Sequence, residues 1–271
     1  MKAVLLQFNS SDDKQANLAM AEQLIRAVAK AERPELIVLP EIWTYQGGNP
    51  AGARAAAELA GEGVAWRMLS SLARELGCVI HGGSINESAD GRMYNTSFVF
   101  DIGGNQVARY RKIHLFDMIG SDASVYKESA LYSRGAELAT FSVGEFSFGC
   151  AICYDLRFPE LFATLAQRGV DAIVVPAAFT LATGLAHWEV LCRARAIETQ
   201  TYLLAANQSG PYAVGNEVRA NFGNSMVVSP WGQVVARAED GIGYIAATLQ
   251  LTSVLDVRNR MPVAHHRVPF G

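Results

Sequence analysis

The chain has 271 residues, of which 50% are hydrophobic and 18% charged, a composition typical of a globular protein with a sizeable core. Its formal net charge of −3 argues against binding to nucleic acid or to an anionic membrane surface. No apolar run approaches the ~18 residues that span a bilayer, and the first residues lack the length of a signal peptide. The four cysteines suggest no disulfide framework, so we expect a reducing, cytoplasmic location.

The first third of the chain predicts strands and helices in alternation. A short apolar strand at 4–8 precedes a helix that Asp12 or Asp13 caps. The continuous apolar run at 36–39 is typical of a parallel strand covered on both faces, and Glu41 follows it directly. Chemistry gathers at the carboxyl ends of such strands, so Glu41 is either a functional carboxylate or a cap on the next element.

The middle of the chain predicts a second strand end that carries a charged residue. A loop at 44–52 and helices at 53–60 and 63–77 precede expected strands at 78–85 and 94–101, which are joined through 86–91, and at 106–111. Lys112 follows the last of these strands, although an isolated lysine there is more often solvated surface. Residues 113–135 show little periodicity, and long connections of this kind are usually functional or disordered.

The sequence around Cys153 predicts a strand that hands over to a helix. Residues 146–152 are typical of a buried strand, and helical spacing begins at Leu156. At such a turn a side chain is exposed near backbone N–H groups and a helix N-terminus, which together stabilise a thiolate. Alternatively, Cys153 is a buried apolar cysteine like Cys150, or the two form a C-x-x-C pair with a redox or zinc role.

The rest of the chain predicts a mixed α/β fold. We expect helices at 184–199 and 251–260, an irregular end from 262, and strands at 138–143, 172–175, 202–206, 223–228, 233–237 and 242–247. Long βα units alternate with β-hairpins, which favours a mixed sheet or a pair of sheets covered by helices. No linker or repeat interrupts the chain, so residues 1–271 are interpreted as one domain.

Three strand ends therefore carry a carboxylate, an ammonium and a thiol, namely Glu41, Lys112 and Cys153. In one cleft they would form a complete acyl-transfer apparatus. The glutamate would take the thiol proton and later activate water, the lysine would stabilise the oxyanion, and the thiolate would attack. Their spacing along the chain does not by itself show that they converge.

Three motifs in this order resemble the nitrilase, or carbon–nitrogen hydrolase, superfamily over essentially the whole chain: LPE at 39–41, YRKIHLFD at 110–117 and CYDLRFPE at 153–160. The resemblance implies an α-β-β-α four-layer sandwich of two mixed sheets flanked by helices. It implies a Glu41–Lys112–Cys153 triad that needs no metal or organic cofactor. It also implies that Glu128 holds the lysine and orients the amide, and that the backbone N–H of Tyr154 completes the oxyanion hole.

Within this family, GLAHWE at 184–189 and RARA at 193–196 resemble the branch that contains omega-amidase and deaminated-glutathione amidase. That branch hydrolyses amides of small carboxylic acids, typically α-keto acids, to acid and ammonia through a thioester. The chain departs from it at Leu185, where proline is usual, and in the stretch MIGSD at 118–122. A nitrilase or an N-carbamoyl amino acid hydrolase is therefore the alternative function, and a non-catalytic binding protein on the same fold is the remote one.

Loop positions at strand ends suggest the substrate-binding candidates Tyr45, Phe116, Phe179, Thr183 and His187. His114 could instead serve a papain-type Cys–His hydrolase, although its apolar neighbours favour a structural role. Asp155 is expected to fix the turn after Cys153 rather than to take part in the chemistry. The resemblance finally implies a small-molecule amide as ligand and a homodimer or higher homo-oligomer as the assembly.

Overall fold

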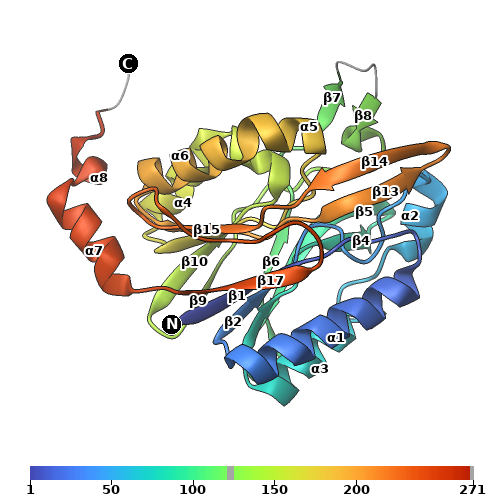
Figure 1. Cartoon of the computed structure of the whole chain (residues 1–271), viewed down its shortest axis with the longest axis horizontal. Helices are drawn as coiled ribbons and strands as arrows, with labels where there is room; N and C mark the ends of the chain where they lie inside the picture. The colour runs from blue at the N-terminus through green and yellow to red at the C-terminus, as the bar shows by residue number, and fades with distance from the viewer. Residues whose placement is uncertain (121–124, 269–271) are drawn as a thin grey trace.

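The structure is a computed structural model that describes residues 1–120 and 125–268. Two β-sheets pack against each other, and helices cover both outer faces (Figure 1). This layering confirms the α-β-β-α sandwich that the sequence motifs implied. In the described residues no helix is both long enough and apolar enough to cross a bilayer.

The first sheet has seven strands, and six of them form one hydrogen-bonded row. In spatial order these are β17 (Gly243–Thr248), β1 (Lys2–Gln7), β2 (Leu36–Val38), β3 (Val79–His81), β5 (Arg92–Phe100) and β4 (Ile85–Ala89). The seventh, β6 (Gln106–Arg111), also pairs with β5. Helices α1 (Lys14–Glu32) and α3 (Val64–Leu76) cover the outer face of this sheet (Figure 1). Ala3 and Leu5 join the core between the sheets, and Val4 and Leu6 the core under the helices, because successive strand side chains alternate.

The second sheet has six strands. Their spatial order is β16 (Val234–Arg237), β15 (Met226–Val228), β12 (Tyr202–Ala205), β11 (Ala172–Val174), β10 (Phe146–Cys150) and β9 (Thr140–Val143). Helices α4 (Pro159–Gln167) and α6 (Glu189–Thr199) cover its outer face (Figure 1). Strands β10, β11 and β12 run parallel, so their carboxyl ends meet at one edge of the sandwich.

Shorter elements surround that edge. They are α2 (Pro50–Ala56), the hairpin β7 (Asp117–Ile119) with β8 (Val125–Lys127), η1 (Glu128–Ala130), η2 (Cys153–Arg157), α5 (Leu181–Thr183), the π-helical turn η3 (Gly184–Trp188) and the hairpin β13 (Ser209–Val214) with β14 (Glu217–Phe222). Both hairpins lie at the end of the molecule that carries α2 and α5 (Figure 1). The C-terminal helices α7 (Leu251–Arg260) and α8 (Val263–His266) lie at the opposite end.

Several predicted boundaries were wrong, and each has a local cause. The strand expected at 78–85 is divided into β3 and β4, because Gly83 adopts φ +59° and its Cα packs against the backbone of Pro40. The hairpin turn lies at residues 90–91 rather than across 86–91. Helix α2 begins at Pro50, inside the expected loop, since Asn49 accepts the N–H of Ala51 and caps it.

The expected irregular connection at 113–135 contains β7, β8 and η1, and the β13–β14 hairpin was not predicted. The strands of the β7–β8 hairpin contain no buried residue and those of the β13–β14 hairpin contain one each, so both hairpins lack the apolar pattern of the core. Leu185 lies in the helix expected at 184–199 and is 72% exposed, because the π-helical turn shifts the helical register. Ser121 and Asp122, within the departure at 118–122, lie outside the described residues.

Candidate active site

Glu41 lies three residues after β2 ends, where its backbone is hydrogen-bonded to residues that follow strands of the second sheet. Its N–H donates to the carbonyl of Ala177 (3.4 Å), and its carbonyl accepts from the side chain of Gln208 (3.0 Å). The next residue, Ile42, has φ +42°, which is strained for a β-branched residue, and its N–H donates to Ser84 Oγ at 3.0 Å. The loop that carries the carboxylate is thus fixed from both sheets.

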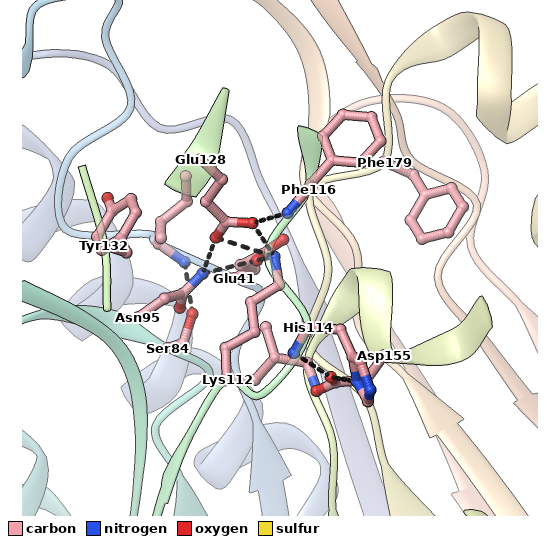
Figure 2. A network of polar contacts seen from close by, with 12 residues as sticks. Glu41, Ser84, Asn95, Lys112, His114, Phe116, Glu128, Tyr132, Asp155 and Phe179 are labelled. Carbon is pink, nitrogen blue, oxygen red and sulfur yellow. Dashed lines mark hydrogen bonds and ion pairs between the residues drawn. The ribbon is translucent and has the colours of Figure 1, made fainter. Parts of the chain in front are cut away.

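Lys112 lies between two carboxylates (Figure 2). Its Nζ is 2.8 Å from Glu41 Oε1 and 3.0 and 2.9 Å from the two oxygens of Glu128. Asn95 Nδ2 donates to both glutamates, at 2.8 Å to Glu41 Oε1 and 3.2 Å to Glu128 Oε1. The backbone N–H of Phe116 donates to Glu128 Oε2 at 2.6 Å. Every oxygen that faces the ammonium therefore has a fixed position.

These contacts set the charges of the site. Burial alone would lower the pKa of Lys112, but the carboxylates of Glu128 and Glu41 outweigh it and hold that pKa well above its ordinary value. Burial raises the pKa of Glu128, and the ammonium of Lys112 offsets part of that rise. Lys112 is consequently a permanent cation at neutral pH.

Cys153 begins the tight turn η2, three residues after β10 ends. Its φ is +46°, a left-handed conformation that is uncommon for residues other than glycine, and its N–H donates to the carbonyl of Pro176 at 2.9 Å. Burial raises the pKa of the thiol well above its ordinary value, Glu41 raises it further, and Lys112 and the N–H of Ala178 offset part of the rise. The sulfur is therefore a thiol at rest and needs a base in order to react.

Glu41 has the geometry of that base. Its hydrogen bonds to Lys112 and Asn95 both end on Oε1. Among the described residues no nitrogen or hydroxyl donor reaches Oε2, and the carboxylate also contacts the Cys153 thiol, which contributes to the raised thiol pKa. One carboxylate oxygen is thus fixed by the lysine, while the other remains to accept a proton from sulfur.

The four side chains open into one cavity of about 430 Å³. Its described walls come from both sheets and from both hairpins, and they include Glu41, Lys112, Glu128 and Cys153. Its other described charged lining residues are all basic: Arg54, Lys127 and Arg219. The arrangement is suited to covalent acyl transfer, because the nucleophile, the base and the cation can all reach one substrate in this cavity.

Comparison with known proteins identifies the fold that carries this cavity. Residues 2–259 match the carbon-nitrogen hydrolase family. The chain belongs to this family. The resemblance of the sequence motifs to it is thereby confirmed.

Among relatives of this carbon–nitrogen hydrolase, human deaminated glutathione amidase is 39% identical to it, over 97% of this chain and 81% of the relative. Human omega-amidase is 36% identical, over 97% of this chain and 93% of the relative. The crystal structure of Nit3 from Saccharomyces cerevisiae, a member of branch 10 of the nitrilase superfamily, superposes with a TM-score of 0.87. It is 31% identical and covers 97% of this chain and 94% of its own.

In the structure of this hydrolase, four of the five substrate-binding candidates lie around Cys153. Tyr45 and Phe116 line the main cavity. Phe116, Phe179 and Thr183 border a second hollow of about 20 Å³ on the other side of Cys153. His187 lines neither hollow: the π-helical turn buries Gly184 and Trp188, so the imidazole lies outside, with Nδ1 3.2 Å from Arg157 Nη2. Tyr154 follows Cys153 in η2 and borders the smaller hollow.

His114 does not face the sulfur. Its Nδ1 lies 2.7 Å from Asp155 Oδ1, and its ring stacks on Phe158 with centroids 3.7 Å apart. Asp155 also accepts the N–H of Ile152 at 2.8 Å, so it holds the turn just before Cys153. His114 and Asp155 therefore contact each other and stabilise the turn that carries Cys153 (Figure 2).

Asn95 and Tyr132 are among the polar residues of the site that the sequence interpretation missed. Asn95 lies within the buried strand β5 and bridges Glu41 and Glu128, and Tyr132 lines the cavity with its hydroxyl 2.7 Å from Asn86 Oδ1. No isolated polar position marks Asn95 in the sequence, because Thr96 and Ser97 follow it in the same strand. Cys150 and Cys153 are both free thiols, and no group of three His, Cys, Asp or Glu in residues 1–120 and 125–268 is placed to hold a metal ion.

Proposed function

We propose that this carbon–nitrogen hydrolase is a cysteine-dependent amidase that converts the amide of a small carboxylic acid, including α-keto acids, to the free acid and ammonia. The observation that carries the proposal is the position of Glu41. One of its carboxylate oxygens is fixed by Lys112 and Asn95, and the carboxylate also contacts the Cys153 thiol. A protonated thiol, a base in contact with it and a buried cation are what amide cleavage through a thioester requires.

Acylation begins when Glu41 takes the proton of Cys153 and the sulfur attacks the amide carbon. The carbonyl oxygen becomes an oxyanion, which the ammonium of Lys112 and the backbone N–H of Tyr154 stabilise. Glu41 then gives its proton to the amide nitrogen, the C–N bond breaks, and ammonia leaves a thioester on Cys153. Glu128 holds Lys112 in place with two contacts and directs the amide toward the sulfur.

Deacylation uses the same groups. Water gives a proton to Glu41 and attacks the thioester carbon, and Lys112 again stabilises the oxyanion. When the intermediate collapses, the C–S bond breaks, the acid leaves, and the proton on Glu41 returns to the sulfur of Cys153. No step needs a metal ion or an organic cofactor.

Two observations support a carboxylic acid amide as the substrate. Two relatives that span 97% of this chain are named for amidase activity, one on deaminated glutathione and one as an omega-amidase. The charged lining residues other than Glu41 and Glu128 are Lys112, Arg54, Lys127 and Arg219, so the described walls favour an anionic acyl group.

We also propose that residues 1–271 form one cytoplasmic domain that assembles as a homodimer or a larger homo-oligomer. The support for assembly is an exposed apolar strip along η3 and α6, formed by Leu185, Val190 and Ile197. Light scattering on the purified chain tests it: a dimer or larger species is expected, and it should dissociate in the variant Val190→Asp. A monomer at micromolar concentration would contradict the proposed assembly.

Ammonia release from a panel of amides tests the proposed function. The panel contains α-ketoglutaramate, α-ketosuccinamate, deaminated glutathione and simple aliphatic amides, with a nitrile and an N-carbamoyl amino acid as competing substrate classes. We expect an acid amide to have the highest kcat/KM and Cys153→Ala to abolish turnover while the variant stays folded. Preference for the nitrile, or carbon dioxide release from the carbamoyl compound, would instead assign the alternative activity.

A further inference from the structure

Residues 176–179 follow β11 and lie between the nucleophile and the base; we call them the linking segment. The carbonyl of Pro176 accepts the N–H of Cys153 at 2.9 Å, and the carbonyl of Ala177 accepts the N–H of Glu41 at 3.4 Å. Adjacent peptide groups of one short segment therefore bind the two residues that exchange a proton. A displacement of the linking segment would change the separation between the Cys153 sulfur and the Glu41 carboxylate.

The linking segment also supplies a donor to the sulfur. The N–H of Ala178 forms a hydrogen bond with the Cys153 side chain and lowers the pKa of the thiol, against the rise that burial causes. This N–H favours the thiolate, which is the form that attacks the substrate. Its distance from the sulfur depends on how the N–H of Phe179 is held, because the two peptide groups share the Cα of Ala178.

Asn207 holds the peptide group of Phe179. Its Oδ1 accepts the Phe179 N–H at 3.0 Å, and its Nδ2 donates to the carbonyl of Gly223 at 2.7 Å. The backbone N–H of Asn207 donates to Ser225 Oγ at 2.9 Å. Asn207 is fully buried, so these hydrogen bonds are shielded from water and hold the side chain firmly. The linking segment is thereby fixed to the segment that precedes β15.

Gln208, the next residue, holds the loop that carries the base. Its Nε2 donates to the carbonyl of Glu41 at 3.0 Å and to Ser10 Oγ at 2.9 Å, and its Oε1 accepts the N–H of Ser10 at 3.0 Å. Its own N–H donates to the carbonyl of Ala177 at 2.9 Å, the oxygen that also accepts the N–H of Glu41. Gln208 is fully buried as well. Two consecutive residues after β12 therefore hold the nucleophile, through the linking segment, and the base.

The peptide group that joins Glu41 to Ile42 shows why the base needs this support. Ile42 has φ +42°, a left-handed conformation that a β-branched residue adopts only under constraint. Gln208 holds the carbonyl of this peptide group, and Ser84 Oγ accepts its N–H at 3.0 Å. Without the Gln208 hydrogen bond this peptide group is free to relax, and the side chain of Glu41 would turn with it.

We infer that Asn207 and Gln208 are positioning residues that set the separation between the Cys153 sulfur and the Glu41 carboxylate. The inference rests on the proposed amidase function, because it concerns the proton transfer between these two groups. Neither Asn207 nor Gln208 is among the described lining residues of the cavity, so both act without contact to the substrate. Proton transfer needs its heavy atoms within hydrogen-bond reach, and a misplacement of about 1 Å can lower a rate by about 10²-fold.

Alkylation of Cys153 tests the Asn207 contact and needs no turnover. Asn207→Leu removes the acceptor for the Phe179 N–H but keeps a side chain of similar size. The N–H of Ala178 should then move away from the sulfur, so that less thiolate forms at neutral pH. The rate at which iodoacetamide alkylates Cys153, followed by mass spectrometry, should fall roughly tenfold at neutral pH, and its pH profile should move to higher pH.

Asn207→Asp is the matched control for this measurement. It keeps an oxygen that accepts the Phe179 N–H, so the alkylation rate should stay within about threefold of wild type even where the melting temperature falls. Asn207→Ala removes the acceptor without adding bulk and replaces the leucine variant if that variant does not fold. An alkylation rate equal to wild type in the variant without an acceptor would overturn the positioning role of Asn207.

Steady-state kinetics test Gln208. Gln208→Met removes the donor to the carbonyl of Glu41 but keeps the length of the side chain. For the amide with the highest kcat/KM, kcat should fall roughly 10- to 100-fold while KM stays within about threefold, because Gln208 does not contact the substrate. Gln208→Ala loses the same donor and should show the same division between kcat and KM.

Gln7→Met is the matched control for the loss of a buried amide. The side chain of Gln7 is bonded to Ser225 and to the carbonyls of Glu239 and Gly241, none of which belongs to the linking segment. Its kcat should stay within about threefold of wild type. Equal losses of kcat in Gln7→Met and Gln208→Met would overturn the positioning role of Gln208. A wild-type enzyme that hydrolyses no amide would refute the proposed function, whereas the alkylation rates would still decide the role of Asn207.

Discussion

Two buried carboxylates flank Cys153, and they differ in how their oxygens are used. Asp155 accepts the N–H and Nδ1 of His114 on Oδ1, at 3.0 and 2.7 Å, and the Tyr110 hydroxyl and Ile152 N–H on Oδ2, at 2.7 and 2.8 Å. Glu41 takes both of its described nitrogen donors on Oε1 alone. Both carboxylates are buried and each lies near a basic residue, so burial and charge do not distinguish them.

The distribution of hydrogen bonds does distinguish them. An ionised carboxylate offers about four acceptor positions, and four contacts occupy those of Asp155. It can hold the turn but has no position left for a transferred proton. Glu41 has the same capacity with one oxygen uncommitted, so it can exchange a proton with sulfur or water. The count of free acceptor positions therefore separates a bracing carboxylate from a reactive one.

The largest expected effect comes from substituting Glu41. Glu41→Gln keeps the size of the side chain and an acceptor for Lys112 but removes the base, so kcat/KM should fall by at least roughly 10³-fold. The fold should persist, with a melting temperature within about 3 °C of wild type. Ammonia release and thermal unfolding measure the two quantities. Activity within tenfold of wild type would show that another group deprotonates Cys153.

Asp155 should show the opposite pattern. Asp155→Asn turns one acceptor into a donor that faces other donors, so the free energy of unfolding should fall by roughly 2–4 kcal/mol. Activity per folded molecule should stay within tenfold of wild type. Tyr110→Phe is the matched control, because it removes one of the four hydrogen bonds and should cost about 1 kcal/mol. Urea unfolding gives these values; an Asp155→Asn enzyme that is stable yet inactive would invalidate the comparison.

The sequence predicted the reactive residues around Glu41 better than the hydrogen-bond partners of Asp155. Glu41, Lys112 and Cys153 each follow an apolar run of strand length, and the ends of strands can be located from composition alone. Asp155 was expected to fix its turn, but its partners Tyr110 and His114 come from another strand and the loop after it. Pairing between distant segments is set by tertiary packing, which local patterns do not contain.

The hairpins that line the cavity were harder to predict than Glu41, Lys112 and Cys153. The strands of the β7–β8 and β13–β14 hairpins are mostly exposed or half-buried, so the alternation of apolar and polar residues that marks a core strand is weak in them. Arg219 and Tyr212 therefore drew no notice in the sequence, although they line the cavity. His187 stands beside the pocket in the sequence but outside it in space, because a π-helical turn is not visible in a periodic pattern.

Substitution of Asn95 tests what holds Oε1 of Glu41 in its hydrogen bonds. Its amide donates to Glu41 Oε1 and Glu128 Oε1 and so holds two of the oxygens that face Lys112. Asn95→Leu should lower kcat roughly 10- to 100-fold, because both carboxylates lose the donor that positions them. Asn95→Gln should recover part of this loss. Ammonia release per folded molecule measures the effect, and a variant that loses stability but keeps kcat would give Asn95 a packing role only.

His81 extends the comparison to a buried group whose ring has no partner. It lies in β3 between the sheets, fully buried, with its ring 5.9 Å from that of Phe141, and in the described structure neither ring nitrogen has a hydrogen-bond partner. Burial lowers the pKa of His81 to about 3, from an ordinary value of 6.5. Between pH 3 and pH 6.5, His81 is therefore protonated in the unfolded chain but neutral in the folded one. The free energy of unfolding should fall as the pH drops through 6.5.

Between pH 8 and pH 5.5 this residue should lower the free energy of unfolding by about 1.4 kcal/mol, because pH 5.5 lies about one unit below the pKa of the histidine in the unfolded chain. His81→Leu removes the protonation and replaces the unpaired ring by an apolar side chain of similar size. The variant should therefore lose about 1.4 kcal/mol less than wild type over this pH range, as urea unfolding at both pH values would measure. Equal losses in the two proteins would mean that the imidazole has a partner in solution, and His81 would then join Asp155 as a satisfied brace rather than stand as an unpaired group.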